Sequence, residues 1–498
     1  MIKKLLFVLI LAVAVLTTCV TLGGSKTPAT IEAYKALTDR NPIMTHNFGA
    51  DPTILVYNDR VYIYMTGDVL EYDHYLEIKT NSYNNINTLR VVSSADLTNW
   101  VYHEPIKVAG SEGVARWAQR SWAPAITYKN VNGQDKFFLY FSNNANGVGV
   151  LTADSPLGPW TDPIGRALVS RQTPNCSDVP WVFDPAILID DDGRVYLYFG
   201  GGVPQGREAD PGSARVVELN SDMISLAGDP VRIDVPYFFE ALVMNKINGK
   251  YILSYCTNWS VTEQARNSLR IDRAVIAIMS GDNPMGPFKL ERTLFRNPGT
   301  FFGVWGNNHH DIFQFKGQWY LAYHSQILEE AMGIRGKGYR VTHIDVIRMN
   351  NGMFESATGT RRGVQQVGRL NPYIWHQGAT NAISAEISFN NEQLSANTDG
   401  AWLGIVGADF GDTGAKSITV SAYAQRAERG NRNSIEIRTG SPFESRNSPP
   451  SEIIGNITIR NSTIEEHTIN LTKTITGIQD IYFIFNGDFI LDAWQFNE

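Results

Sequence analysis

One pattern recurs five times in the first 370 residues of this 498-residue chain. Each copy has a polar or small residue, an apolar strand, a short turn and an aromatic-rich returning strand. Successive copies begin 72, 61, 56 and 69 residues apart, which leaves room for a four-stranded sheet and its loops in each copy. Five such units predict a five-bladed β-propeller closed around a central channel. The copies begin at Asp51, Ala123, Asp184, Glu240 and His309.

The turns inside the five copies have the composition of tight β-hairpins. Asn and Gly tolerate the positive φ angles that two-residue hairpin turns require. Aromatic residues then alternate along each returning strand, which places the rings on one face where neighbouring sheets pack. A β-sandwich with accidental internal similarity is the alternative, but it would not explain five matched hairpins. The turns are Asn58-Asp59, Asn132-Gly133, Asp192-Gly193, Asn248-Gly249 and Lys316-Gly317.

The register of the repeat brings chemistry-bearing residues together. In a propeller the innermost strands line the channel, so the first residues of the five copies converge on the axis. A single Asp before Pro usually caps a turn, but Asp51, Asp184 and Glu240 share one register position. Clustered carboxylates are unfavourable unless their pKa values are split or a cation compensates. Glycoside hydrolysis uses such a split, with one carboxylic acid as proton donor and one carboxylate that activates water.

At these residues the chain resembles glycoside hydrolase family 43, over residues 41 to 368. The motifs are Gly49-Ala50-Asp51-Pro52, Val182-Phe183-Asp184-Pro185 and Tyr237-Phe238-Phe239-Glu240. The resemblance implies that Asp51 is the general base, that Asp184 modulates the pKa of the acid and orients it, and that Glu240 is the general acid. It also implies cleavage with inversion at the anomeric carbon and no cofactor for the chemistry.

Three further residues gain a role from the same resemblance. It implies that His309, in Gly306-Asn307-Asn308-His309-His310, faces the axis and contacts a hydrated metal, often calcium. A histidine hydrogen-bonded beneath the pocket without a metal is the alternative. Arg340 and Trp122 resemble residues that bind the sugar, although Ala125 stands where many relatives have Asp.

The substrate is predicted from the same motifs together with Asn87-Thr88-Leu89-Arg90 and Lys136-Phe137-Phe138-Leu139-Tyr140. They look like the arabinofuranosidase branch, whose members remove α-L-arabinofuranosyl side groups from arabinoxylan. A β-xylosidase or an arabinan-degrading enzyme of the same fold is the runner-up. A propeller that binds glycans without cleaving them is the alternative from another class. An acidic or sulfated glycan is disfavoured by the acidic pocket and the net charge of −7, which also disfavours nucleic acid.

After residue 368 the repeat stops, and short alternating strands predict an antiparallel β-sandwich over residues 369–498. Ala385-Glu386 and Asp492-Ala493-Trp494-Gln495-Phe496 resemble carbohydrate-binding module family 6. The resemblance implies a structural calcium held by Glu386 and Asp492, with Trp494 in the core. No Phe, Tyr or Trp lies between Ile453 and Thr476, so sugar binding by an aromatic pair there is in question.

The N-terminus has the features of an export signal. Lys3 and Lys4 precede an apolar run from Leu5 to Leu16 that is too short to span a membrane, and no other stretch is apolar enough. We expect a signal peptide at residues 1–24, with Cys19 as a candidate lipid anchor, and a linker at 25–40. The protein would be secreted, periplasmic or held at the cell surface. Cys176 and Cys256 could form one disulfide or stay unpaired; the oligomeric state stays open.

Overall fold

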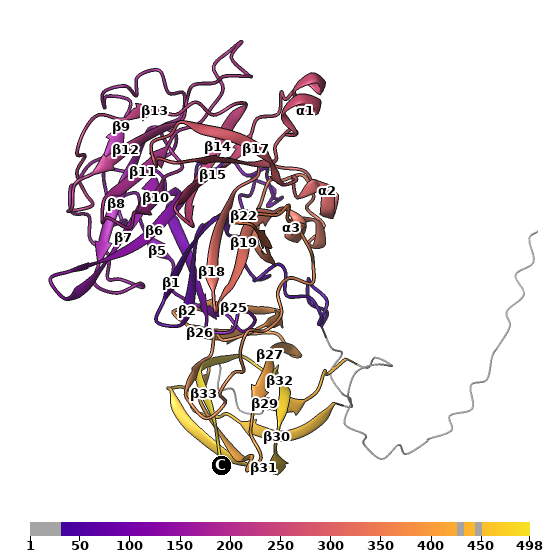
Figure 1. The fold of residues 1–498 in the computed structure, drawn as a ribbon. Coiled ribbons are helices and arrows are strands. Elements are labelled where there is room, and N and C mark those ends of the chain that lie inside the picture. The colour runs from indigo at the N-terminus through magenta and orange to yellow at the C-terminus, as the bar shows by residue number, and fades with distance from the viewer. Residues whose placement is uncertain (1–30, 426–432, 444–450) are drawn as a thin grey trace, which may run out of the picture.

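The computed structural model describes residues 31–425, 433–443 and 451–498 (Figure 1). The expected signal peptide, Cys19 and the first residues of the expected linker lie outside these ranges. Strands far outnumber helices among the regular elements of the described chain, as the repeat predicts, so the all-β class is confirmed. None of its helices is long and apolar enough to cross a membrane. The helices within the described ranges are α1 (Glu263–Leu269), α2 (Gly299–Phe302) and α3 (Ile327–Ala331).

Five antiparallel sheets follow one another along the first part of the chain, which we call the five-sheet region. Each begins with one of the expected hairpins, and positive φ angles occur in the turns at Asn58, Asn132 and Asn248. The sheets contain β1 (Ala50–Tyr57), β2 (Arg60–Thr66), β3 (Thr88–Ser94), β4 (Val101–Tyr102) and β5 (Ile106–Lys107); β6 (Trp122–Val131), β7 (Gln134–Ser142), β8 (Gly147–Ala153) and β9 (Val169–Ser170); β10 (Ala186–Ile189), β11 (Val195–Phe199), β12 (Arg215–Leu219) and β13 (Val231–Arg232); β14 (Phe238–Ile247), β15 (Lys250–Thr257), β16 (Ile276–Gly281) and β17 (Phe288–Phe295); and β18 (His310–Phe315), β19 (Gln318–Ser325) and β20 (Val341–Val346). A small hairpin, β21 (Met349–Asn350) with β22 (Met353–Phe354), follows.

Hydrophobic clusters lie between consecutive sheets. Separate clusters join the first sheet to the second, the second to the third, the third to the fourth, and the fourth to the fifth. Another cluster joins the fifth sheet back to the first, with Phe313 and Tyr320 packed among Val61, Ile63 and Met65. The innermost strands also meet there, because the backbone N–H of Ile54 in β1 donates to the carboxylate of Asp311 in β18 at 2.8 Å. The alternating aromatic residues thus supply apolar layers between sheets and leave the strand starts free for polar groups.

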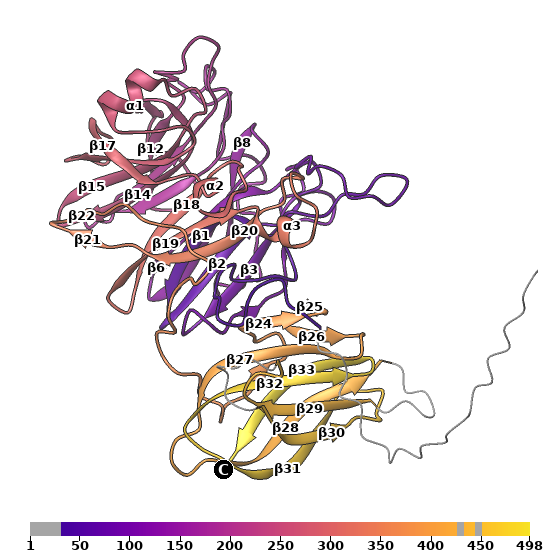
Figure 2. The same cartoon turned by 90° about the vertical axis from the view of Figure 1, so that its right-hand side faces the viewer.

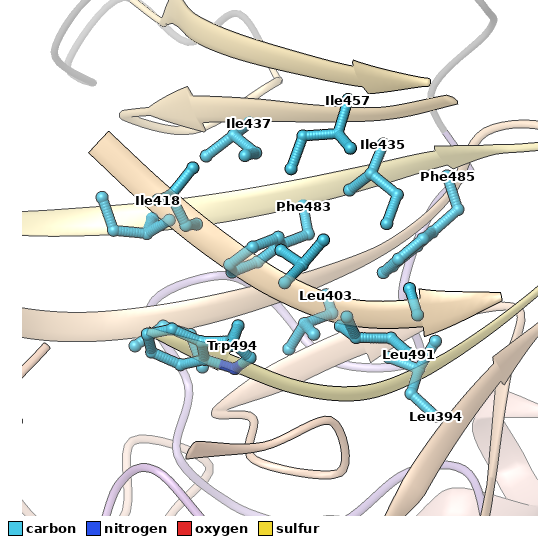
Figure 3. Packing of buried hydrophobic residues seen from close by; sticks show 14 of the residues in the cluster. Leu394, Leu403, Ile418, Ile435, Ile437, Ile457, Phe483, Phe485, Leu491 and Trp494 are labelled. Atoms are coloured by element: carbon cyan, nitrogen blue, oxygen red, sulfur yellow. The ribbon is translucent and has the colours of Figure 1, made fainter. Parts of the chain in front are cut away.

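The last part of the chain, which we call the two-sheet region, has two antiparallel sheets that enclose one apolar cluster (Figure 3). Trp494 is fully buried in that cluster, as expected from the sequence, where it packs near Phe483 and Phe496. One sheet contains β25 (Ile387–Asn390), β26 (Gln393–Ala396), β33 (Phe489–Asn497), β28 (Ala415–Ala424), β31 (Glu465–Ile475) and β23 (His376–Gln377); the other contains β24 (Ile383–Ala385), β27 (Ala401–Asp409), β32 (Ile478–Asn486), β29 (Ser434–Thr439) and β30 (Glu452–Thr458).

The two regions touch along β25 and β26, which lie nearest the five-sheet region in both views (Figures 1 and 2), with β24 beside them in Figure 2. Phe389 in β25 packs edge-to-face on His46 and lies against Tyr102. The His103 imidazole lies 2.6 Å from the Glu392 carboxylate across the same contact. Buried aromatic and polar contacts together indicate that the regions are docked rather than loosely tethered.

Both cysteines of the five-sheet region are buried and unpaired. Cys176 lies in the cluster between the second and third sheets, and Cys256 lies in β15 between the fourth and fifth. The two thiols therefore pack as small apolar side chains, which is the alternative to a disulfide that the sequence left open.

Candidate active site

A cavity of about 380 Å³ lies where the innermost strands of the five sheets begin. Four of the five repeat-register residues line it, and the fifth, Ala123, is buried beside it. Trp122 and Arg340, the two residues expected to bind sugar, also line the cavity. The lining residues are Asp51, Tyr83, Trp122, Asn144, Ala145, Trp181, Phe183, Asp184, Glu240, Asn307, His309 and Arg340.

Local backbone irregularity aims the register residues into this cavity. Asp51, Ala123 and Asp184 all have positive φ angles, between 25° and 50°, and Ala241 next to Glu240 has φ 62°. The strand register shifts at the starts of β1, β6 and β14. Bulges of this kind redirect side chains, and non-glycine residues at positive φ gather at functional sites because the surrounding structure must hold them.

Hydroxyl and imidazole groups hold neighbouring sheets in register at this point. The Thr66 hydroxyl donates to Asp51 Oδ2 at 2.7 Å and accepts the backbone N–H of Ala123 at 2.7 Å. The backbone N–H of Asp184 donates to the Ser142 hydroxyl at 2.9 Å. His324 Nδ1 accepts the backbone N–H of Asp51 at 3.1 Å. The register residues therefore sit in a fixed hydrogen-bonded frame rather than on flexible loops.

Arg340 connects two buried carboxylates. Its Nη1 donates to Asp51 Oδ1 at 2.9 Å, while Nε and Nη2 donate to the two oxygens of Asp68 at 3.0 and 2.8 Å. The guanidinium also lies over the Tyr83 ring, 5.0 Å from its centre. This fork geometry holds the plane of the guanidinium, so one face of Arg340 is set toward the cavity.

The charge state of Asp51 follows from these contacts. Burial by itself would raise the pKa of Asp51, but the Arg340 guanidinium and the neighbouring His324 and His309 together lower it well below its usual range. Asp51 is therefore an ionised carboxylate at neutral pH, even though it is almost inaccessible to solvent.

Glu240 and Asp184 are shifted in the opposite direction. Burial, followed by the negative charge of Asp51, raises the pKa of Glu240 to about 8. Burial and the charge of Glu240 raise the pKa of Asp184 above its usual range. Glu240 Oε1 is buried and accepts no hydrogen bond within the described part of the chain. Asp184 Oδ2 accepts the backbone N–H of Ala241 at 3.2 Å, which ties it to the strand that carries Glu240.

His309 lies between the carboxylates. Its Nδ1 is 3.6 Å from Asp51 Oδ1 and 3.8 Å from Asp184 Oδ2, and burial lowers its pKa to about 4. A second cavity of about 170 Å³ runs beneath it along the innermost strands. Within residues 31–425, 433–443 and 451–498, no group of three or more His, Cys, Asp or Glu side chains is arranged to hold a metal ion. A hydrated metal at His309 therefore stays a prediction.

The expected calcium ligands of the two-sheet region do not come together. The register pairs Ile387 with Ala396 and Ala396 with Phe489, so Glu386 lies at one end of the β25–β26 hairpin. Asp492 lies at the other end, where its carboxylate accepts hydrogen bonds from Gln393 and Ser421. Four residue rows separate the two backbone positions, or about 13 Å along the strands. Glu386 and Asp492 thus do not fit a shared ion.

Sequence reasoning missed some residues that line the cavity and some that hold its side chains from behind. Tyr83 lines the cavity and Asp68 binds Arg340, and both belong to the long connection between β2 and β3, outside the repeat. His324, near the end of β19, accepts the backbone N–H of Asp51. Trp181 and Phe183 immediately precede Asp184, and this aromatic flank was the one available signal. Trp181 also packs edge-to-face on Phe239, which precedes Glu240. Aromatic rings therefore border two of the three acids, as is common where a sugar ring is bound.

Comparison with known proteins places this site in a family. Residues 39–354 match the model of glycosyl hydrolases family 43, and residues 373–498 match that of carbohydrate binding module family 6. An arabinoxylan arabinofuranohydrolase of Paenibacillus polymyxa is 41% identical over 92% of this chain and 74% of its own length. One from Bacillus subtilis is 39% identical over 93% of each chain.

A solved structure extends the likeness to three dimensions. The Bacillus subtilis family 43 arabinoxylan arabinofuranohydrolase, crystallised in complex with cellotetraose, has a TM-score of 0.87 and 39% identity. The match covers 94% of this chain and 99% of that one. With the cavity and its split carboxylates, these matches establish that the chain belongs to glycosyl hydrolase family 43.

Proposed function

We propose that this glycosidase releases α-L-arabinofuranosyl side groups from arabinoxylan with inversion at the anomeric carbon. The observation that carries the proposal is the opposite shift of two carboxylates in one cavity, Asp51 toward ionisation and Glu240 toward protonation. Relatives named arabinoxylan arabinofuranohydrolases, similar over more than nine-tenths of this chain, support the substrate. The cavity volume falls in the range of small-ligand pockets, about 300–1,000 Å³, which suits one or two sugar units.

The proposed architecture is a five-bladed β-propeller at residues 41–368, followed by a β-sandwich at 369–498. The apolar cluster that joins the fifth sheet to the first supports closure of the ring. One apolar core between two sheets supports the sandwich. In this arrangement the propeller axis passes through the carboxylate cluster. The second cavity, beneath His309, would be the continuation of the central channel along that axis.

Asp51 is the proposed general base. An inverting glycosidase needs a carboxylate that takes a proton from water while the water attacks the anomeric carbon. The contacts of Asp51 with Arg340 and Thr66 keep the group ionised and fix its direction. Because its pKa is so low, Asp51 is a weak base, and its contribution rests chiefly on positioning and on its charge.

Glu240 is the proposed general acid, and Asp184 its modulator. A raised pKa keeps Glu240 protonated at neutral pH, so that it can transfer a proton to the departing glycosidic oxygen. The charge of Glu240 raises the pKa of Asp184, and the bond of Asp184 to the backbone N–H of Ala241 ties it to the strand segment that carries Glu240. The imidazole of His309 lies between Asp51 and Asp184 and is neutral at neutral pH, so it would act as a spacer between the two carboxyl groups.

Arg340 and Trp122 are proposed to bind the sugar. Asp68 and Asp51 hold the guanidinium so that it can donate to hydroxyl groups. The Trp122 indole N–H donates to the Tyr83 carbonyl at 3.0 Å, so its ring is fixed at the wall of the cavity. The C-terminal region, which matches a carbohydrate-binding module, is proposed to bind polysaccharide as well.

Export remains part of the proposal. We propose that residues 1–24 are a signal peptide and 25–40 a linker, with the mature protein secreted, periplasmic or anchored through Cys19. The charged and apolar segments of residues 3–16 are the support for this assignment.

The decisive experiment incubates the purified protein with arabinoxylan, arabinan and xylo-oligosaccharides and identifies the released sugars. Arabinose from arabinoxylan, released first as the inverted anomer in a proton NMR time course, is the expected result. Xylose from xylo-oligosaccharides would instead establish the β-xylosidase alternative. Binding without any release would support the non-catalytic alternative, and Glu240→Gln is the matched inactive control.

A further inference from the structure

A separate cavity of about 310 Å³ lies beside the catalytic one, next to α1 and α2. Two tryptophans stand at its wall, and both are unusually exposed, Trp259 at 43% and Trp305 at 57%. Three arginines share the same cavity. The lining residues are Trp259, Arg266, Asp272, Arg273, Val275, Arg296, Asn297, Thr300 and Trp305.

The two cavities are neighbours across one short loop. Trp305 lines the outer cavity and Asn307 lines the catalytic one, so their Cα atoms are at most about 7 Å apart. Asn297 holds this loop, since its side-chain amide donates to the Gly306 carbonyl at 2.9 Å and to the Ala274 carbonyl at 3.1 Å. A polysaccharide that places one unit at Glu240 would extend over the second cavity with an adjacent unit.

The Trp305 ring is held in place although it is exposed. It lies directly on Gly299 of α2, where an added Cβ would come within 2.4 Å of the indole. A glycine at this point lets the ring lie flat on the helix backbone. A flat, exposed indole beside polar side chains is suited to stack on a sugar ring.

The arginines give this cavity a positive charge within an acidic protein. Arg266 lies 3.7 Å from Asp272, the one carboxylate of the lining. Arg273 and Arg296 make no side-chain ion pair with any described residue. Their guanidinium groups are therefore available to a ligand, and a planar carboxylate matches their paired N–H donors.

From this combination we propose that the cavity at Trp259 and Trp305 binds a hexuronate substituent of the polysaccharide, close to the arabinose that is removed. The tryptophans would stack on the sugar ring, and Arg273 and Arg296 would bind its carboxylate. The inference rests on the proposed function for the identity of the polymer, but the site is separate from the catalytic carboxylates. It differs from the expectation that acidic glycans are disfavoured, because that expectation concerned the acidic pocket where the cleaved sugar sits.

Calorimetric titration of the full-length protein tests the site without any need for catalysis. The probes are xylotetraose, the same oligosaccharide carrying one glucuronic acid, and free glucuronic acid. We expect the acidic oligosaccharide to bind about tenfold more tightly than the neutral one, with the advantage lost in 0.5 M NaCl. Equal affinities at low salt would overturn the proposal. The proposal would also be overturned if free glucuronic acid bound tightly and the acidic oligosaccharide did not. The site would then recognise a free anion rather than a branch of the polymer.

Substitutions test whether this cavity causes the preference for the acidic oligosaccharide. Arg273→Gln with Arg296→Gln should remove the tenfold preference and leave the neutral oligosaccharide unchanged. Trp305→Ala should weaken both oligosaccharides. Arg166→Gln, which removes an exposed positive charge between β8 and β9, is the matched control and should keep the preference. If the preference survives in the double variant, or is lost in the control, the carboxylate is not bound in this cavity.

An activity assay separates this inference from the proposed function. With neutral arabinoxylan the double variant should match the parent protein, whereas with glucuronic acid-bearing arabinoxylan its kcat/KM should fall about tenfold. Failure of the parent protein to release arabinose from either polymer would reject the proposed function, and the titration would still decide the binding site.

Discussion

The five-sheet and two-sheet regions are built from the same antiparallel strands but place polar groups differently. In the five-sheet region the apolar clusters lie between sheets, and Asp51, Asp184 and Glu240 gather where the sheets begin. In the two-sheet region one apolar cluster fills the space between sheets. Its expected ligands, Glu386 and Asp492, lie at opposite ends of a hairpin.

The difference shows what the arrangement of sheets does to charge. In the five-sheet region the strand starts meet at a cavity lined by polar residues, and burial there shifts the pKa values of its carboxyl groups. In the two-sheet region Asp492 lies outside the apolar core instead, where neighbouring polar side chains hydrogen-bond it. Chemistry is therefore expected in one region and docking in the other.

The largest effect is expected at the centre of the five-sheet region. Glu240→Gln and Asp51→Asn should each lower kcat/KM on arabinoxylan by about 10²–10⁴-fold, because the first removes the proton donor and the second removes the positioned negative charge beside the attacking water. Equal circular dichroism spectra would show that the fold is retained. Glu240→Gln should lose less activity on an aryl arabinofuranoside than on arabinoxylan, because the aryl leaving group needs no proton. Asp51→Asn should lose as much activity on the aryl substrate as on arabinoxylan. Full activity of Asp51→Asn on arabinoxylan would reject the assignment.

A smaller loss of kcat/KM is expected from a substitution at Asp68, which contacts Arg340 rather than the substrate. Asp68→Ala removes the carboxylate that accepts hydrogen bonds from Nε and Nη2 of Arg340, so the guanidinium keeps only its contact with Asp51 and is less firmly oriented. We expect kcat/KM to fall about 100-fold, as misplaced catalytic groups do. Asp68→Glu should restore part of the activity. Wild-type kinetics in Asp68→Ala would mean that Arg340 is positioned by Asp51 alone.

The pH profile tests the split between the carboxylates. Glu240 must be protonated to act as acid, and its pKa is raised to about 8. Activity should therefore hold through neutral pH and fall about tenfold per pH unit above pH 8. On an aryl arabinofuranoside this alkaline fall should be shallower. A profile of kcat/KM that already falls between pH 5 and 6 would show that burial does not raise the pKa of Glu240.

The smallest effect on activity is expected at the contact between the regions. Phe389→Ala removes packing on His46 and Tyr102 and should cost about 1–2 kcal/mol of stability, since the ring is only partly buried. Thermal unfolding would show the loss, while kcat on a small aryl substrate should stay within twofold. A large loss of kcat would show that docking shapes the catalytic cavity.

The repeat predicted a large part of this site because its signals are local. Hairpin turns such as Asn132-Gly133 and the alternating aromatics define where each sheet starts, and the shared register then brings Asp51, Asp184 and Glu240 together. Asp68 and Tyr83 could not be found in this way. They lie in a long connection with no periodicity, and only contacts with Arg340 place them.

Local sequence patterns are enough to predict the all-β class, the five hairpins and the residues that share a register, since these depend on neighbours a few positions apart. The family resemblance already implied which acid is the base and which is the proton donor, but only contacts in the folded chain explain why Asp51 is ionised and Glu240 is protonated. Arg340 is 289 positions from Asp51 in the chain, yet its guanidinium lies 2.9 Å from that carboxylate. Proton affinity depends on burial and on such distant charges, and no local pattern encodes either. The same holds for Glu386 and Asp492, whose separation follows from strand pairing rather than from their motifs.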